Sequence, residues 1–247
     1  MSVFLALWRR ELASFFLSPI AYVMAVFFLV VEGFSFWYLA SALAMGSTEV
    51  TVMSQFFGTL FFWIPFFFIV PVLTMRLFAE EKRSQTIETL LTAPVTDLQV
   101  VLSKYFGVLS FYICMWLPTI SYAFILAVFS SETAPIDFGP MVGGYLATLL
   151  IGMFFLAVGL FCSALTRNQV VSAIICFAFM FVVFFAGLLH PYVQSEVVKD
   201  ICIFGSSVMH MLDFSRGSID TRPIVLYVSG TLLVLFGVLR VLETRKW

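Results

Sequence analysis

The sequence predicts an all-α integral membrane protein with six membrane-spanning helices. Of its 247 residues, 62% are hydrophobic and only 11% are charged, whereas soluble domains carry about 25% charged residues. The apolar residues also fall into six runs of about 20 residues or more, each long enough to cross the hydrocarbon core as a helix. Such a chain leaves no soluble region large enough for a catalytic domain of its own.

The first predicted element is a helix that lies on the membrane surface. Residues 3–16 place apolar side chains on one face and Arg9, Arg10 and Glu11 on the other. This pattern is typical of an amphipathic surface helix. The segment has no small-residue cleavage site, so we do not expect a removable signal peptide. Pro19 then suits the first turn of the first span.

The six predicted spans form one transmembrane domain. That domain covers residues 1–247, with spans over residues 20–44, 56–74, 105–129, 141–165, 170–189 and 223–242. Pro65 and Pro71 interrupt the second span, which predicts a kink there. The segment of residues 190–222 is predicted to be an extracytoplasmic loop, with short helices over residues 194–204 and 208–214.

The placement of lysine and arginine predicts that both termini are cytoplasmic, because short cytoplasmic loops carry an excess of these residues. With the N-terminus inside, ten basic residues fall on the cytoplasmic side: Arg9, Arg10, Arg76, Lys82, Arg83, Lys104, Arg167, Arg240, Arg245 and Lys246. Only Lys199, Arg216 and Arg222 fall outside. The opposite orientation would reverse this ratio.

The segment of residues 76–104 is the longest polar stretch in the first half of the chain. A charged start is followed by apolar residues at spacings of three and four, which predicts an amphipathic helix that Pro94 ends. The charged start is Glu80, Glu81, Lys82 and Arg83, and the next helical positions are Thr86, Ile87, Leu90 and Leu91. Thr96 and Gln99 then form a capping box that begins a second helix. The segment is either a compact cytoplasmic knob or a solvated connection.

A resemblance to a known family rests on Arg76, Ala79, Glu80, Glu81, Lys82, Arg83, Thr86, Glu88, Leu90, Leu91, Pro94 and Lys104. This pattern resembles the segment between spans two and three of ABC-2 type transporter permeases, the half-size membrane subunits of ATP-binding-cassette exporters. It resembles most the bacterial branch that includes gliding-motility and nitrous-oxide-reductase-maturation permeases. The surface helix, the six spans and the short link of residues 167–169 fit the same family. The family usually has Gly where this chain has Gln85.

The resemblance implies that the knob is a coupling helix seated in a groove of a cytoplasmic ATPase. The implied coupling residues are Arg76, Glu80, Glu81, Lys82, Arg83, Thr86, Ile87, Glu88, Leu90, Leu91 and Pro94. Ile87, Leu90 and Leu91 would be buried anchors. The polar rim around them would consist of Glu80, Glu81, Lys82, Arg83 and Glu88. Arg76 and Glu80 lie four residues apart and are expected to pair. The sequence contains no G-x-x-x-x-G-K-[ST] loop, so ATP and Mg are expected on a separate ATPase and no cofactor on this chain.

The implied function is that of a permease subunit that couples ATP hydrolysis to export or extraction of a substrate across the cytoplasmic (inner) membrane of a bacterium. Two permeases, as a homodimer or heterodimer and surrounded by membrane lipid, would work with two cytoplasmic ATPase subunits. A mechanical or scaffold component that uses the ATPase without moving cargo is an alternative. An intramembrane enzyme is disfavoured, because it would need catalytic groups clustered at one depth. The sequence does not identify the substrate.

Neither a catalytic residue nor a metal site is predicted. His190 and His210 are the only histidines, and their spacing matches no compact ligand pattern. The formal net charge of −1 gives no reason to expect a nucleic-acid partner.

Glu32 and three phenylalanines are candidates for the translocation path. A carboxylate within a span is a functional hypothesis by default. The alternative interpretation of Glu32 is an interhelical hydrogen bond or a protonated, packed side chain. Phe61, Phe62 and Phe66 would suit an apolar gate, although packing against lipid is the favoured explanation for them.

Overall fold

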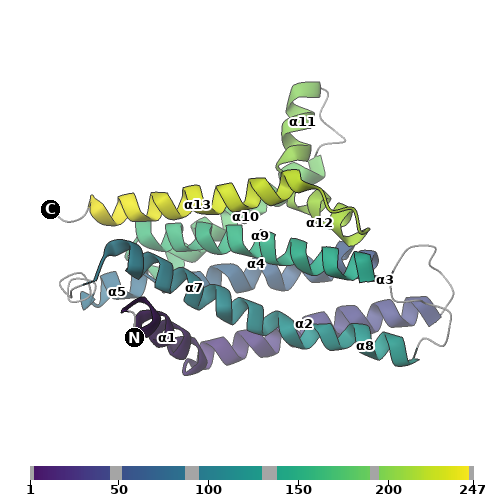
Figure 1. The fold of residues 1–247 in the computed structure, drawn as a ribbon, viewed down its shortest axis with the longest axis horizontal. Coiled ribbons are helices and arrows are strands. Elements are labelled where there is room, and N and C mark those ends of the chain that lie inside the picture. Colours follow the sequence, from purple (N-terminus) through teal and green to yellow (C-terminus); the bar gives the residue numbers. More distant parts are fainter. Residues whose placement is uncertain (1–2, 45–51, 87–94, 130–137, 190–194, 245–247) are drawn as a thin grey trace.

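A computed structural model describes residues 3–44, 52–86, 95–129, 138–189 and 195–244. Within these ranges the chain is almost entirely helical and has no β-strand. The long helices run side by side along one axis, and both ends of the described chain lie at the same end of the bundle (Figure 1).

The first half of the chain contains α1 (Val3–Phe16), α2 (Pro19–Ala44), α3 (Val52–Gly58), α4 (Leu60–Thr74) and α5 (Ala79–Arg83). The second half contains α7 (Asp97–Trp116), the 3₁₀ turn η1 (Leu117–Thr119), α8 (Ile120–Phe129), α9 (Phe138–Leu165), α10 (Gln169–Leu189), α11 (Glu196–Phe204), α12 (Ser207–Ser215) and α13 (Thr221–Glu243). Six helical stretches are long and apolar enough to cross a membrane: Pro19–Ala42, Leu60–Arg83, Asp97–Tyr122, Phe138–Leu165, Gln169–Leu189 and Thr221–Glu243. The prediction of an all-α protein with six membrane-length helices is confirmed.

The start of α7 follows the predicted capping box. The Thr96 side chain accepts a hydrogen bond from the Gln99 backbone N–H (3.3 Å), and the Gln99 side chain accepts one from the Thr96 backbone N–H (3.2 Å). Two N–H groups that have no partner within the helix are thereby satisfied. The helix therefore begins at Asp97, before the predicted span, and η1 interrupts it near Pro118.

The second span is interrupted at Thr59. This residue has extended backbone (φ −73°, ψ 149°) and separates α3 from α4, while its hydroxyl donates to the Phe56 carbonyl (3.0 Å). Pro65 and Pro71 both lie inside α4. Neither proline ends the helix. Within a membrane span, neighbouring helices and side chains can satisfy the backbone carbonyl that a proline leaves without its N–H donor.

α9 lies at the centre of the bundle and is its most buried span. In its most apolar stretch 72% of the residues are buried, against 22% in α2 and in α13. It contacts α4, α7, α10, α12 and α13. Glycines allow the close approach: a Cβ at Gly152 would lie 2.5 Å from the Tyr112 ring, and one at Gly159 would lie 2.2 Å from the Thr74 hydroxyl oxygen. Small residues at helix contacts are the usual way for membrane helices to pack closely.

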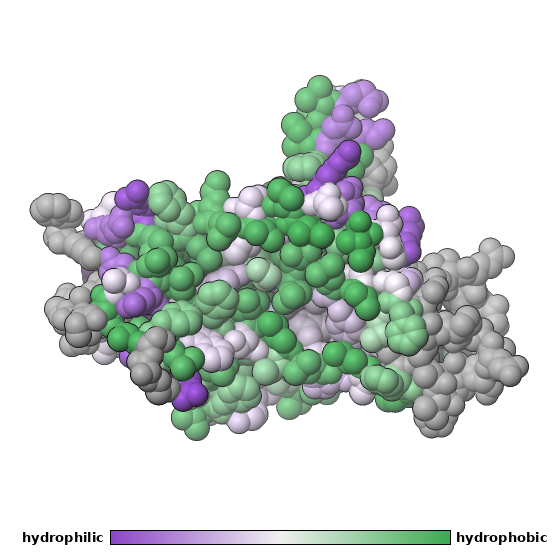
Figure 2. All heavy atoms as spheres, in the orientation of Figure 1, coloured by the Kyte–Doolittle hydropathy of each residue, from purple (hydrophilic) through white to green (hydrophobic). Residues whose placement is uncertain are grey.

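Polar residues gather at the two ends of the bundle, and apolar residues cover the band between them (Figure 2). At the end opposite the termini, α11 projects away from the bundle and α12 packs against α9 and α3 (Figure 1). These helices confirm the two short helices predicted for this loop. His210 on α12 is buried beside Tyr227 of α13, with its Nδ1 2.9 Å from the tyrosine hydroxyl. Burial lowers the pKa of His210, although Asp213 and Asp220 partly oppose this.

Candidate functional site

A buried cluster of charges joins three helices at the end of the bundle that holds the termini. Lys104 on α7 is 2% exposed, and its Nζ donates to Oε1 of Glu11 on α1 (3.2 Å) and to Oε1 of Glu81 on α5 (2.6 Å). Arg10 adds contacts to Glu11 (2.8 Å) and Glu81 (3.7 Å). Buried charges need such partners, because an unpaired ion is very costly away from water. The cluster therefore fixes α1 and α5 to α7.

α1 approaches α7 closely enough for this contact because Gly107 lies one turn after Lys104. A Cβ at Gly107 would lie 2.9 Å from the Glu11 Cβ. The sequence pattern places Glu11 on the solvated face of α1, and the structure contradicts that placement, since Glu11 is 7% exposed and faces α7. The attraction of Lys104 outweighs the solvation that a surface carboxylate would keep.

The ionisation of Glu11 predicts a pH dependence of stability. Burial on its own would raise the pKa of Glu11, but Lys104 and Arg10 outweigh it and hold the pKa below its ordinary value of 4.5. A lowered carboxyl pKa stabilises the fold above pH 4.5, and this contribution disappears as the pH falls through the lowered value. Thermal unfolding should therefore show wild type more stable than Glu11→Gln at pH 7, with a difference that shrinks below pH 4.5. An equal difference at all pH values would contradict this assignment.

A second set of contacts fixes the turn that follows α4 to the end of α9. The Ser163 hydroxyl accepts hydrogen bonds from the backbone N–H groups of Phe78 and Ala79 (both 3.0 Å) and donates to the Met75 carbonyl (2.9 Å). The Lys82 ammonium donates to the Ala164 carbonyl. One residue of α9 thus satisfies three backbone groups of the turn. The segment after α4 cannot move without either breaking these bonds or moving α9.

The described coupling residues divide into an inward and an outward set. Glu81 and Lys82 turn into the protein, Glu81 toward Lys104 and Lys82 (7% exposed) toward α9. Their predicted place in an exposed polar rim is therefore wrong. Glu80, Arg83 and Thr86 are exposed. The remaining coupling residues, Ile87, Glu88, Leu90, Leu91 and Pro94, lie outside the described residues.

The expected ion pair between Arg76 and Glu80 is absent from the part of the chain that the structure describes. Residues 75–78 form a turn rather than an α-helix, so the spacing of four does not place the two side chains together. The Arg76 guanidinium lies instead over the Phe15 ring, 6.0 Å from its centroid.

The expected amphipathic helix from Glu80 to Leu91 is not continuous. α5 ends at Arg83, and Gln85 has a φ of +59°. This left-handed conformation costs a residue with a side chain about 1–2 kcal/mol and costs glycine much less. The backbone thus gives a physical reason for a glycine at this position, where the sequence carries Gln85.

Glu32 lies inside the bundle on α2. It is 0% exposed, and neither carboxylate oxygen has a hydrogen-bond partner among the described residues. The alternative of an interhelical hydrogen bond therefore does not hold there. The hydroxyl of Ser35, one turn further along α2, bonds elsewhere, to that of Thr59 (3.3 Å). A role for Glu32 in a translocation path and its other alternative, a protonated and packed side chain, both stay predictions.

The three candidate gate phenylalanines pack within the chain. Phe62 is 0% exposed and Phe66 is 3% exposed, because α4 lies between α2, α9 and α10. Packing against lipid is therefore the wrong explanation for these two residues. Phe61 is half-buried, with its ring 5.4 Å from that of Phe34. Their proposed role as a gate is not tested by these contacts.

Sequence reasoning missed the hydrogen-bonding role of Ser163 and the partners of Lys104. One signal was present for Lys104, which falls on the face of α7 that also carries Val101, Tyr105 and Val108. A charge on an apolar face indicates a buried partner, but nothing local indicates that Glu11 is that partner. Ser163 gives no signal, because one serine in an apolar helix is common.

The two histidines belong to the segment at the opposite end of the bundle, where no metal site is predicted. His190 lies outside the described residues, and His210 bonds to Tyr227. In the described ranges no three His, Cys, Asp or Glu side chains are grouped as metal ligands would be.

The fold and this site define a multi-pass helical membrane protein in which buried contacts fix a polar segment between two spans to the rest of the bundle. The sequence model of the family described as ABC-2 family transporter protein matches residues 40–201, about two thirds of the chain. The chain belongs to this family. It is a membrane permease component of an ABC transporter, and its family implies a partnership with an ABC ATPase subunit. No curated protein matches the sequence.

Proposed function

We propose that this permease couples ATP hydrolysis by a separate ATPase to movement of its membrane spans. It thereby exports or extracts a substrate across the cytoplasmic membrane of a bacterium. The residues after α4 receive the motion of the ATPase. Two permeases, as a homodimer or heterodimer, act with two ATPase subunits that carry the ATP and Mg. The resemblance of residues 76–104 supports, as part of this proposal, a position in the branch of gliding-motility and nitrous-oxide-reductase-maturation permeases.

One observation carries this proposal: the segment after α4 is fixed to three other helices. Ser163 fixes it to α9, and Lys104 fixes it to α7 and α1. A loop that only connected two spans would need no such contacts. A force applied to this segment reaches the most buried helix of the bundle directly.

The distribution of charge supports a cytoplasmic position for this segment. Both described chain ends, α5 and the charge cluster lie at one end of the bundle (Figure 1). That end holds most of the described Lys and Arg residues, whereas Lys199, Arg216 and Arg222 belong to the opposite end. By the positive-inside rule the end with the termini faces the cytoplasm.

Site-specific cross-linking to the ATPase tests the proposal. We expect a photoreactive or thiol cross-linker on Leu90→Cys to capture the ATPase subunit in co-expressed, purified complexes. The same cross-linker on Leu232→Cys should not capture it, because Leu232 is 63% exposed on the membrane-length helix α13. Equal capture by both positions, or capture by neither from a complex that hydrolyses ATP, would contradict the proposal.

A further inference from the structure

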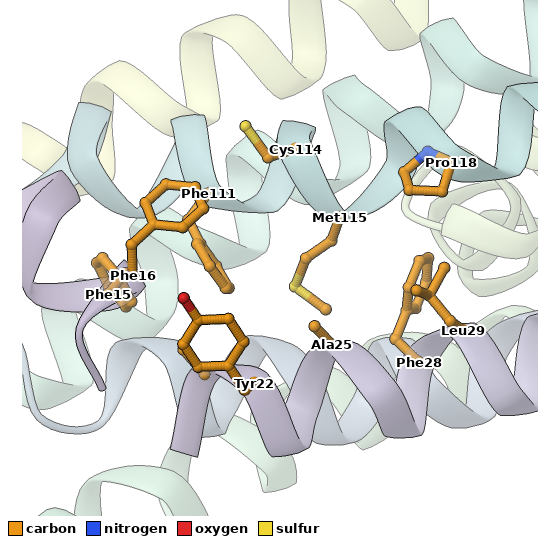
Figure 3. Close-up of a pocket in the computed structure, with 11 residues that line it drawn as sticks. Phe15, Phe16, Tyr22, Ala25, Phe28, Leu29, Phe111, Cys114, Met115 and Pro118 are labelled. Atoms are coloured by element: carbon orange, nitrogen blue, oxygen red, sulfur yellow. The ribbon is translucent and has the colours of Figure 1, made fainter. Parts of the chain in front are cut away.

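Two cavities meet at the corner between α1 and α2. One is a polar cavity of about 520 Å³, bordered by charged residues of α1, α5 and α7 and of the turn after α4. The other is an apolar groove of about 150 Å³ between α2 and α7, lined by residues such as Tyr22, Phe28, Phe111 and Met115 (Figure 3). Phe15 borders both cavities. Its ring stacks on Phe111 at 5.3 Å, and the Arg76 guanidinium lies 6.0 Å from the ring centroid.

The polar cavity holds charges of both signs that have no ion-pair partner among the residues that the structure describes. Arg76 and Glu80 border the cavity, and neither makes an ion pair with any described residue. Glu81 uses one carboxylate oxygen for Lys104, while its other oxygen, Oε2, is buried and has no hydrogen-bond partner in the described ranges. A ligand that satisfied these groups would carry both an anionic oxygen and a donor cation.

The groove supplies the apolar half of such a ligand site. Its walls are aromatic and aliphatic, and it opens to the side of the bundle, where Tyr22 is 58% exposed. α1, which forms one edge, also exposes the apolar side chains of Val3 and Phe16. An amphipathic helix of this kind lies at the level of the lipid headgroups. The charged cavity therefore lies where headgroups lie, and the groove lies where acyl chains begin.

We propose that the corner between α1 and α2 binds one phospholipid that carries a primary ammonium, of the phosphatidylethanolamine type. Arg76 binds the phosphodiester, Glu80 and the free oxygen of Glu81 accept hydrogen bonds from the ammonium, and an acyl chain occupies the groove beside Phe15. The inference does not depend on the proposed transport function.

The chemistry of the site separates this lipid from its relatives. A phosphatidylcholine presents the same phosphate, but its quaternary ammonium has no N–H to donate. A phosphatidylglycerol has no cation for Glu80 or Glu81. A phosphodiester suits the fork of donors on an arginine. Arg76 should therefore contribute to binding of all three lipids. Glu80 should contribute most to that of phosphatidylethanolamine, because a quaternary ammonium gains only the charge attraction and no hydrogen bond.

Native mass spectrometry of the purified full chain measures these affinities directly. We expect dioleoyl-phosphatidylethanolamine to bind more tightly than the dioleoyl forms of phosphatidylcholine and phosphatidylglycerol. Arg76→Gln should weaken the binding of phosphatidylethanolamine and phosphatidylcholine, each roughly tenfold, because hydrogen bonds to charged groups are the strong ones. Glu80→Gln should weaken phosphatidylethanolamine binding more than phosphatidylcholine binding, and should not weaken phosphatidylglycerol binding. The control variant Arg9→Gln changes an exposed arginine of α1 that does not border the cavity. It should leave the affinity for each of the three lipids unchanged.

Two further measurements make the proposal falsifiable. Water-soluble glycerophosphoethanolamine should bind much more weakly than the intact lipid, and equal affinity would overturn the role of the groove. Thermal unfolding without added lipid should show Glu80→Gln as stable as wild type, because Glu80 is exposed. Equal affinity of wild type for all three lipids, or unchanged lipid binding by Arg76→Gln, would overturn the proposal.

Discussion

Replacing Leu90 with aspartate is expected to abolish the stimulation of ATP hydrolysis while the permease still folds and inserts. The resemblance to ABC-2 permeases predicts that Leu90 is a buried apolar anchor in the ATPase groove. A carboxylate buried there without a partner would cost about 3 kcal/mol or more, which corresponds to roughly 100-fold weaker association. Co-purification with the ATPase and the ATP hydrolysis rate of the reconstituted complex measure the effect. Leu91→Asp should act in the same way.

The matched control for this prediction is Leu90→Met. Methionine keeps an apolar side chain of similar volume, and such exchanges usually cost little. This variant should therefore retain the ATPase and its stimulated rate. The prediction fails if Leu90→Asp purifies with a full complement of ATPase and hydrolyses ATP at the wild-type rate.

The sequence was sufficient for the parts of the fold that depend on local patterns. The six membrane-length helices follow from apolar runs, because the bilayer sets their length. The capping box at Thr96 and Gln99 also follows, because it involves residues three apart. The interruption at Thr59 was missed, since prolines nearby are the stronger breakers by propensity, yet α4 continues through Pro65 and Pro71.

The candidate site was only partly predictable, because its contacts join distant residues. Glu11 and Lys104 lie 93 positions apart, and Phe78 and Ser163 lie 85 apart. The resemblance implied that Glu81 and Lys82 belong to a polar rim, as charges next to an apolar helical face usually do. Their burial depends on partners that no local window contains. The left-handed Gln85 likewise ends a helix that the spacing of its neighbours predicts to continue.

Removing the Lys104 ammonium is expected to cause a large loss of stability. Lys104→Met keeps an unbranched apolar side chain but leaves the Glu11 and Glu81 carboxylates without their main partner. Breaking a buried ion pair in this way costs about 3–5 kcal/mol. Thermal unfolding of the purified protein at pH 7 should therefore show a much lower midpoint than that of wild type. An unchanged midpoint would mean that the three charges do not depend on one another.

The triple variant Lys104→Met, Glu11→Gln, Glu81→Gln separates the stability of this cluster from its function. Neutralising both carboxylates removes the uncompensated charges, so most of the lost stability should return, and the three substitutions should be strongly non-additive. If the ion pairs also transmit motion from α5 to α1 and α7, this variant should still stimulate ATP hydrolysis less than wild type, although its stability has returned. Recovery of both stability and stimulation would instead assign the cluster to folding alone, and would leave the contacts of Ser163 as the route from the coupling segment to α9.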